Sequence, residues 1–375
     1  MNQGKHWGVA AIAASLVVCL AGCSGGQDKS SGTVRIGVNA PLTGPISAWG
    51  GQYGNGFRMG IDEATQQYKV DPKQFAVDVQ DNAGKPEQAV SIFNMQRAAG
   101  LDDYVSVATG PANAVAPQLD QMGIPHFIEA FDPFITKAGP NRFRIMANSK
   151  AEAPLMINYI TSKHARSVYI IQINFAYANE EVGSIIMPAL AAQNIAVTRE
   201  QFELEQRDFK IVAQKVKAQN PDQIIIIGYS FHIQALLRDL RAQGLVTPGR
   251  IVTSMDFVDL VNSGAPTAEL SDVVFDAPLF EIPGQVPQAA VWRQRYKARF
   301  GVEPTYVPAY AYDTATLIVR AYAMHHSVKT PALIAASPFD GVNGPIKLDG
   351  DRDIEVTGAL ATLNGSGQIV ALASK

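Results

Sequence analysis

Two successive runs of alternating strand and helix patterns constrain the fold of this chain most strongly. Short β-branched runs alternate with segments whose apolar residues recur at helical spacing, and the alternation begins at Thr33 and again at Ser167. The predicted strands span residues 33–39, 75–80, 104–108, 124–128, 167–173, 195–203, 223–227 and 250–254. The predicted helices span residues 53–68, 86–96, 180–192, 208–218, 231–243, 287–300 and 308–325, with another opening after Thr109-Gly110-Pro111. This alternation predicts an α/β fold with parallel sheets and right-handed crossovers.

The restart of the pattern indicates two doubly wound, Rossmann-like lobes. The chain has 375 residues, which suits two domains, and 47% hydrophobic residues, which suits a sizeable core. Residues 355–363 and 368–372 predict a closing antiparallel hairpin with its turn at Asn364-Gly365. Because loops gather at the carboxyl ends of parallel strands, we expect a ligand crevice between the lobes.

The N-terminal segment predicts export. An apolar run from Val9 to Leu20 follows the basic Lys5 and is too short to span a membrane. It ends in Leu20-Ala21-Gly22-Cys23, which resembles a bacterial lipoprotein signal. That resemblance implies that residues 1–22 are removed and that Cys23 becomes a lipidated N-terminus. Residues 23–32 then form a flexible, Gly/Ser-rich tether. A plain cleaved signal and a buried apolar helix are the alternatives.

Composition excludes several classes of partner and site. The chain has 2 Cys, and Cys19 lies in the predicted signal, so we expect no structural disulfide and no Cys metal site. The formal net charge is −3 and no long block of one sign occurs, so we expect no nucleic-acid partner. We expect no cofactor.

Three local patterns resemble a dinucleotide-binding turn, a hydrolase nucleophile elbow and a calcium loop, but none has the residue spacing of that motif. Gly54-x-Gly56 followed by Gly60 lies too far after its strand for a dinucleotide-binding turn. Gly228-Tyr229-Ser230-Phe231-His232 lacks the second glycine of a hydrolase nucleophile elbow. Asp349-Gly350-Asp351-Arg352-Asp353 lacks the spacing of a calcium loop and predicts a polar turn.

Ordered motifs along the body of the chain resemble one family. The segments IGVNAPLTGP (36–45) and GGQYGNG (50–56) resemble the opening of the periplasmic solute-binding proteins of branched-chain amino-acid ABC transporters. Asp208-Phe209 followed by QNPDQIIIIGY (219–229) resembles the second-lobe signature of that family, and YAYDTA (310–315) resembles a later one. The resemblance covers nearly all of the body, in order.

The resemblance implies a type 1 periplasmic binding fold. Two lobes are joined by three chain crossings and close on a ligand as a hinge. Lobe 1 would comprise residues 33–147 and 281–343, and lobe 2 residues 148–280 and 344–375. The family implies a monomeric, non-enzymatic protein of the periplasm or cell envelope that delivers its ligand to ABC permease subunits. A membrane sensor as partner is the alternative, because the fold is shared.

The resemblance also places a site for an amino-acid zwitterion. Such a ligand needs N–H and hydroxyl donors for its carboxylate, an acid for its ammonium and a shaped pocket for its side chain. The loop 110–113 precedes a helix and occupies the carboxylate loop of the family, which assigns a ligand role to Ala112 and Asn113; a helix cap is the alternative. Asp256 follows the strand 250–254, where the family has its ammonium-binding acid; a surface loop acid is the alternative.

Several aromatic residues match positions that face the cleft in the family. Tyr229 follows an apolar strand, Tyr177 lies on the second lobe and Trp49 lies in the first Gly-rich loop, where a lid residue is common. Tyr306 would form part of the opposing wall. Core packing is the alternative for each of these residues.

The loop around Phe131 departs from the family. Many members have small and hydroxyl residues there, whereas this chain has Phe131 flanked by Glu129 and Asp132. Acids near the site would oppose an anion, and aromatic faces would suit a cation. A cationic, amide or aromatic small molecule is therefore the alternative to an amino acid.

Overall fold

The computed structural model describes residues 32–44, 46–355 and 358–372. The predicted signal and Cys23 lie outside these residues. The chain divides into Met1–Gly32 and Thr33–Lys375, and the fold below is that of the second unit. Within the described residues, no helix combines the length and apolarity needed to cross a bilayer.

The first half of the chain forms a 5-stranded sheet in the order β2-β1-β3-β4-β5. All neighbouring strands run parallel. The strands are β1 (Val34–Ala40), β2 (Phe75–Asp81), β3 (Asp103–Val107), β4 (His126–Glu129) and β5 (Arg142–Phe143). Buried apolar runs in β1, β3 and β4 explain why these strands take central positions, since a parallel sheet is covered on both faces.

A 7-stranded sheet follows, in the order β14-β13-β10-β9-β8-β6-β7. Its strands are β6 (Ser167–Ile173), β7 (Ala196–Phe202), β8 (Gln223–Ile227), β9 (Ile251–Thr253), β10 (Val273–Pro278), β13 (Gly358–Leu363) and β14 (Ile369–Ala371). The first five run parallel, whereas β13 and β14 pair antiparallel at one edge. The closing hairpin predicted from the sequence is therefore confirmed. β11 (Phe339–Gly341) and β12 (Gly344–Ile346) form a separate 2-stranded sheet.

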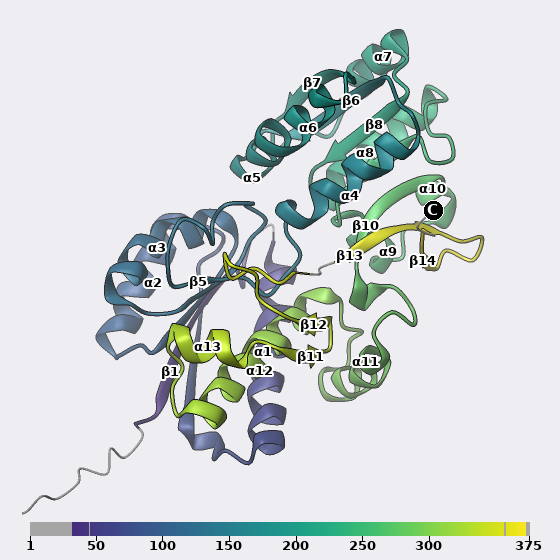
Figure 1. Ribbon diagram of the computed structural model, residues 1–375. Helices are drawn as coiled ribbons and strands as arrows, with labels where there is room; N and C mark the ends of the chain where they lie inside the picture. Colours follow the sequence, from purple (N-terminus) through teal and green to yellow (C-terminus); the bar gives the residue numbers. More distant parts are fainter. Residues whose placement is uncertain (1–31, 45, 356–357, 373–375) are drawn as a thin grey trace, which may run out of the picture. The chain divides into compact units, whose positions relative to one another are not determined.

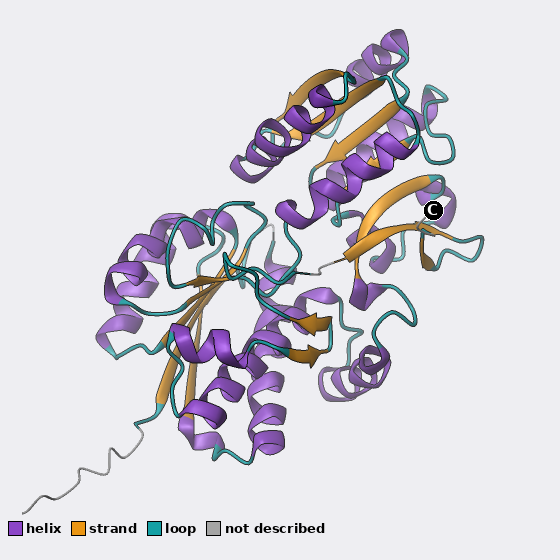
Figure 2. Ribbon diagram, in the orientation of Figure 1, coloured by secondary structure: helices purple, strands orange, loops and turns teal. Residues whose placement is uncertain are grey.

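Helices lie beside the strands of both sheets (Figures 1 and 2). They are α1 (Ser47–Tyr68), α2 (Pro86–Ala98), α3 (Thr109–Met122), α4 (Ser149–Ser162), α5 (Ala176–Glu180), α6 (Met187–Ala192), α7 (Lys210–Gln219), α8 (Ser230–Ala242), α9 (Phe257–Asn262), α10 (Thr267–Leu270), α11 (Pro287–Phe300), α12 (Tyr306–His325) and α13 (Thr330–Ala336). α12 is buried along most of its length and packs against α1. The parallel α/β architecture predicted from the alternating pattern is confirmed.

The region predicted as one helix over 180–192 is not a single α-helix. α5 ends at Glu180, a π-helical segment spans Glu181–Ile186, and α6 begins at Met187. Glu181 is fully buried at the start of the π-helical segment. Helical periodicity in the sequence does not distinguish an α-helix from a short π-helical segment, so the pattern missed this change of helix type.

Residues 344–354 contact segments of the predicted first lobe. β12 pairs with β11, and Asp313 on α12 accepts the backbone N–H groups of Val342 and Asn343 at 2.9 and 3.0 Å. The backbone N–H of Arg144 donates to the carbonyl of Arg352 at 3.0 Å. The lobe boundary after Asn343 remains a prediction.

Candidate ligand-binding site

A pocket of about 370 Å³ opens where strands of both sheets end. Ala108 and Phe131 follow β3 and β4 of the 5-stranded sheet, and Tyr177, Tyr229 and Asp256 follow β6, β8 and β9 of the 7-stranded sheet. Loops at the carboxyl ends of parallel strands are the expected place for a ligand in such a fold. The volume falls in the range of small-molecule sites.

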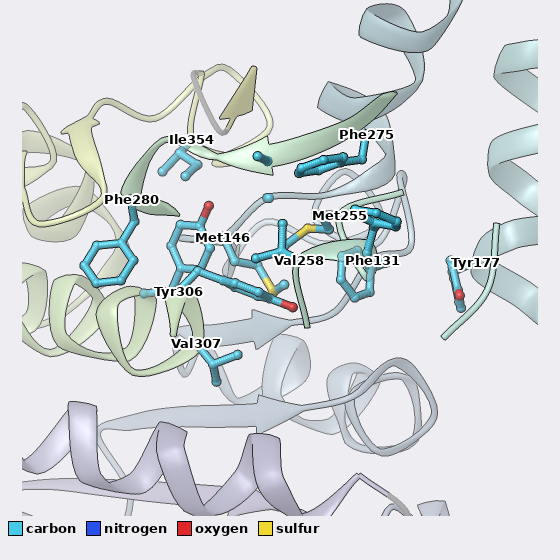
Figure 3. Close-up of a cluster of buried hydrophobic side chains, with 14 of the residues drawn as sticks. Phe131, Met146, Tyr177, Met255, Val258, Phe275, Phe280, Tyr306, Val307 and Ile354 are labelled. Atoms are coloured by element: carbon cyan, nitrogen blue, oxygen red, sulfur yellow. The ribbon is translucent and has the colours of Figure 1, made fainter. Parts of the chain in front are cut away.

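Aromatic side chains form much of the pocket wall. The ring of Phe131 lies 5.6 Å from that of Trp49 and 5.7 Å from that of Tyr177, and the rings of Tyr229 and Phe231 lie 5.8 Å apart. Figure 3 shows Phe131 among buried apolar side chains such as Met255 and Val258, with Tyr177 on a separate segment. The structure thus brings four of the predicted aromatic residues, Trp49, Phe131, Tyr177 and Tyr229, to one pocket.

Asp256 is a buried acid of the pocket. It directly precedes α9, is 3% exposed and accepts a hydrogen bond from the Ser254 hydroxyl at 3.1 Å. Burial, reinforced by the nearby Asp259, raises the pKa of Asp256 to about 8. A cationic group at this place would restore the charged carboxylate.

Glu129 lines the pocket from the end of β4. The Tyr53 hydroxyl donates to its Oε1 at 3.2 Å, and the Thr314 hydroxyl donates to the same oxygen at 3.4 Å. Burial raises the pKa of Glu129 to about 7, although both hydroxyl donors and the nearby charge of Arg144 lower it. From the sequence, Glu129 was considered only as an acidic neighbour of Phe131 and was not predicted as a site residue.

Asp259 is a third acid in the pocket lining. It lies on α9, three positions after Asp256, so both side chains point to neighbouring parts of one helix face. Burial raises the pKa of Asp259 to about 6, while the Trp49 and Tyr306 side chains oppose that rise. Asp259 was not among the residues predicted from the sequence, although the i, i+3 spacing from Asp256 could have indicated it.

No Lys, Arg or His belongs to the pocket lining in the described part of the chain. Isolated charges are costly in a buried site unless they are paired. The carboxyl groups of the pocket must therefore hold protons or meet a cation from outside.

More acids lie behind Asp256. Glu152 on α4 accepts the backbone N–H of Met255 at 2.9 Å, and burial, reinforced by the nearby Glu181 and Asp276, raises the pKa of Glu152. Burial raises the pKa of Glu181 to about 8 and that of Asp276 to about 7. Across the described ranges, no His, Cys, Asp and Glu side chains form a group that could hold a metal ion. These acids therefore surround Asp256 with further protonatable carboxyl groups without forming a metal site.

The N-termini of two helices reach the pocket. Ala108 and Thr109 lead into α3, and Tyr229 and Ser230 lead into α8. Ala108 has φ of 83°, a left-handed conformation that costs a non-glycine residue about 1–3 kcal/mol. Free N–H groups at helix N-termini favour an anion, so these ends are candidate donors for a carboxylate.

Two predicted carboxylate-loop residues lie elsewhere. Ala112 is fully buried in α3 and packs with Ile128, Ala130 and Ile135, and Asn113 is exposed to solvent. Neither belongs to the pocket lining, which includes Ala108 and Thr109 instead. α3 begins at Thr109, so the chain turns into the helix earlier than the loop 110–113 suggested, and one further turn carries Ala112 and Asn113 away.

Tyr306 is also outside the lining but contacts it. It is fully buried, and its ring packs edge-to-face on Trp49 at 6.4 Å. Tyr306 therefore supports the position of Trp49 from behind. Phe231 and Ser230, which line the pocket, were absent from the predicted site because the Gly228–His232 segment was considered only as a nucleophile motif.

Sequence comparison finds relatives over most of the chain. Residues 33–367 match the family model of the periplasmic binding proteins. The Leu/Ile/Val-binding protein BraC3 of Rhizobium johnstonii is 25% identical over 60% of this chain and 63% of its own length. The chain therefore spans just under two thirds of that relative. A Leu/Ile/Val-binding protein of Citrobacter freundii is 22% identical over 86% of this chain and 88% of its own length.

Solved structures share the fold. The branched-chain amino-acid transporter substrate-binding protein LivJ of Streptococcus pneumoniae, in complex with isoleucine, matches with a TM-score of 0.76 and 23% identity over 90% of this chain and 98% of its own. A solute-binding protein of an ABC transporter from Rhodopseudomonas palustris, in complex with 3,4-dihydroxybenzoic acid, matches with a TM-score of 0.78 and 20% identity over 91% and 96%. The chain belongs to the periplasmic binding protein family, in its type 1 branch of two-lobed proteins related to the Leu/Ile/Val-binding proteins.

Proposed function

We propose that this chain is the lipid-anchored, extracytoplasmic substrate-binding protein of an ABC importer. Its ligand is a small compound with a protonated amine, an α-amino acid or a close relative. The observation that carries the proposal is Asp256, a buried carboxyl group in an aromatic pocket whose described lining holds no basic side chain. Periplasmic binding proteins bind ligands and are not enzymes, in agreement with the non-enzymatic role predicted for this chain.

The pocket offers each part of a zwitterion a partner. Asp256 and Asp259 face the ammonium, the helix N-termini at Thr109 and Ser230 face the carboxylate, and the aromatic wall holds the side chain. Relatives named as Leu/Ile/Val-binding proteins support an amino acid. Lipid attachment at Cys23 and delivery to permease subunits complete the proposal, and mass spectrometry of the membrane-extracted protein tests the lipid.

A cationic or amide ligand without a carboxylate is the second candidate. Glu129 and Asp259 favour it, since both add negative charge that opposes an anion. The same charge argues against an aromatic acid, although a structural neighbour was solved with 3,4-dihydroxybenzoic acid. A sensor partner in place of a permease stays an alternative for either ligand.

A thermal-shift screen of the chain without its signal tests the proposal. Amino acids, amides, amines and aromatic acids serve as probes. A ligand at 100 times its dissociation constant adds about 2.7 kcal/mol of stability, which raises the melting temperature measurably. A response only to acids that lack an amine would contradict the proposal.

The substitution Asp256→Asn should weaken binding of any amine found in that screen by more than about 2 kcal/mol, because it leaves the buried ammonium unpaired. Isothermal titration calorimetry measures the loss. Asp340→Asn is the matched control, since Asp340 is exposed on β11 and lies outside the pocket lining. Equal affinities for the two variants would remove Asp256 from the site.

A further inference from the structure

We propose that the ligand carries two protonated nitrogens, one facing Asp256 and the other facing Glu129. This inference rests on the proposed function and narrows its ligand class to a diamine or a diamino acid. The shared chemistry is a short chain with an ammonium group near each end.

The two acids belong to different walls of one pocket. Glu129 ends β4 of the 5-stranded sheet, whereas Asp256 follows β9 of the 7-stranded sheet. A ligand with one ammonium can lie against one of these acids and leaves the other without a ligand partner. A ligand with an ammonium at each end pairs with both.

Each acid retains acceptor capacity toward the pocket. Both donors to Glu129, the hydroxyls of Tyr53 and Thr314, reach Oε1, and no donor to Oε2 occurs among the described side chains. Asp256 accepts one side-chain hydrogen bond, from Ser254. Asp259 differs, because it interacts with the Trp49 and Tyr306 side chains. Glu129 and Asp256 are therefore the acids that can accept hydrogen bonds from a ligand.

A second polar group points to a ligand independently of the acids. Tyr177 lines the pocket at 6% exposure, and its hydroxyl has no hydrogen-bond partner in the described part of the protein. A buried hydroxyl without a partner costs free energy, which a ligand can recover. The aromatic faces of Trp49, Phe131 and Tyr229 suit the methylene chain and the ammonium ends of the same ligand.

The carboxyl groups around the pocket discriminate between one amine and two, because each can lose its proton and pair with an added ammonium. The acids Glu152, Glu181 and Asp276 lie behind Asp256, while no basic side chain belongs to the described lining. A zwitterion brings no net charge to this surrounding, whereas a diamino acid brings one positive charge and a diamine brings two. Each added ammonium that pairs with a buried carboxylate should raise affinity about 10- to 100-fold.

Isothermal titration calorimetry with paired probes tests the inference on the chain without its signal. Lysine is compared with norleucine, and 1,4-diaminobutane with butylamine, so each pair differs by one amine. We expect the doubly aminated member of at least one pair to bind at least about 30-fold tighter. If only lysine binds tighter than its partner, the ligand also has a carboxylate, which the helix N-termini bind. If diaminobutane binds tighter than butylamine, the ligand needs no carboxylate. Both outcomes support a ligand with two protonated nitrogens.

The substitution Glu129→Gln keeps the shape of the side chain and removes its charge. We expect it to lower the affinity ratio within the responding pair at least about 10-fold, while Glu87→Gln, an exposed control on α2, leaves the ratio unchanged. Circular dichroism and thermal melting check that each variant is folded. Should Glu129→Gln not fold, the ratio in the unaltered protein decides alone.

The outcomes separate this inference from the proposed function. Norleucine binding as tightly as lysine, with butylamine matching diaminobutane, overturns the second nitrogen and leaves the amine-binding function standing. If the affinity ratio within the pair is unchanged in a folded Glu129→Gln variant, Glu129 does not bind the second nitrogen. Absence of binding by every amine overturns both proposals.

Discussion

Arg144 connects the pocket to the end of the chain through one buried guanidinium group. Its Nε donates to Asp353 Oδ1 at 2.7 Å, with side-chain exposures of 0% and 2%. Its Nη1 donates to the backbone carbonyls of Ala130 and Asp132, on either side of Phe131. The position of the Phe131 loop therefore depends on a charge pair with a residue far along the chain.

Removing one charge of this pair should be costly. We expect Asp353→Asn to lower the free energy of unfolding by about 3 kcal/mol or more, because Arg144 would be left as a buried charge without its counter-charge. Urea unfolding monitored by fluorescence measures the change. Asp351→Asn is the control: Asp351 is 36% exposed, and its bridge to Lys150 should contribute less than about 1 kcal/mol. Similar losses in both variants would contradict the special role of the buried pair.

At the scale of single residues, the sequence predicted the aromatic and acidic character of the pocket better than the full set of residues that line it. Trp49, Phe131, Tyr177, Tyr229 and Asp256 each follow a strand or enter a loop, so position along the chain placed them at one edge. Their ligand roles remain predictions. Ala112, Asn113 and Tyr306 depended on which face of a helix meets the pocket, and that face is set by where α3 and α12 begin. A shift of one or two residues in a helix start changes the face.

At the scale of elements, glycines allow α1 and α12 to approach closely. A Cβ atom added at Gly56 would overlap the carbonyl oxygen of Pro308, and one at Gly60 would lie 2.7 Å from that of Tyr312. These are the glycines whose spacing suggested a phosphate loop without matching it. Their position in the structure explains why glycine is present: α1 and α12 cross so closely that no side chain fits between them.

We expect Gly56→Ala to destabilise the protein by about 2 kcal/mol or more, because backbone of a buried helix must move to admit the methyl group. Gly51→Ala is the matched control on the same helix, since no atom lies within 4 Å of an added Cβ there. That change should stabilise by about 0.5–1 kcal/mol through helix propensity. Thermal melting compares the two variants, and a stable Gly56→Ala protein would contradict the close crossing.

The elements that the sequence predicted are those with strong local patterns. β1, β6, β8 and the hairpin of β13 and β14 combine β-branched runs with clear turn signals. β10 was missed, because Val273–Pro278 includes a buried Asp276 and a proline that reduce its resemblance to a strand. Its position is fixed by pairing with β9 on one side and β13 on the other, contacts that come from distant parts of the chain.

At the scale of the whole molecule, buried acids outnumber buried basic residues among the described side chains. Burial raises the pKa of Glu129, Asp276 and Asp313 to about 7, and that of Glu181 and Asp256 to about 8. Glu129 and Asp276 lie on strands of the two sheets and Asp313 lies on α12. Glu181 begins the π-helical segment and Asp256 directly precedes α9, so no single local sequence pattern predicts these groups together. Because these raised pKa values occur in several parts of the fold, the protonation of buried carboxyl groups should affect the stability of the whole protein.

The stability of the ligand-free protein should therefore fall as pH rises from 6.5 to 8.5. In this window the unfolded carboxyl groups, with pKa values near 4, are already ionised, whereas the folded ones still hold protons. The folded state binds more protons, so the free energy of unfolding decreases by up to about 1.4 kcal/mol per pH unit for each carboxyl that stays protonated. The buried His126 and His232, whose pKa values burial lowers to about 3 and about 4, oppose this trend only below pH 6.5.

Melting curves across this pH window measure the slope. Asp256→Asn should make it shallower, because the amide does not titrate, while Asp340→Asn should leave it unchanged. An amine ligand should act in the opposite direction, since it binds the ionised acids and releases their protons. The rise in melting temperature that it causes should be larger at pH 8.5 than at pH 6.5. A melting temperature that rises with pH in the ligand-free protein would contradict the buried, protonated state of these acids.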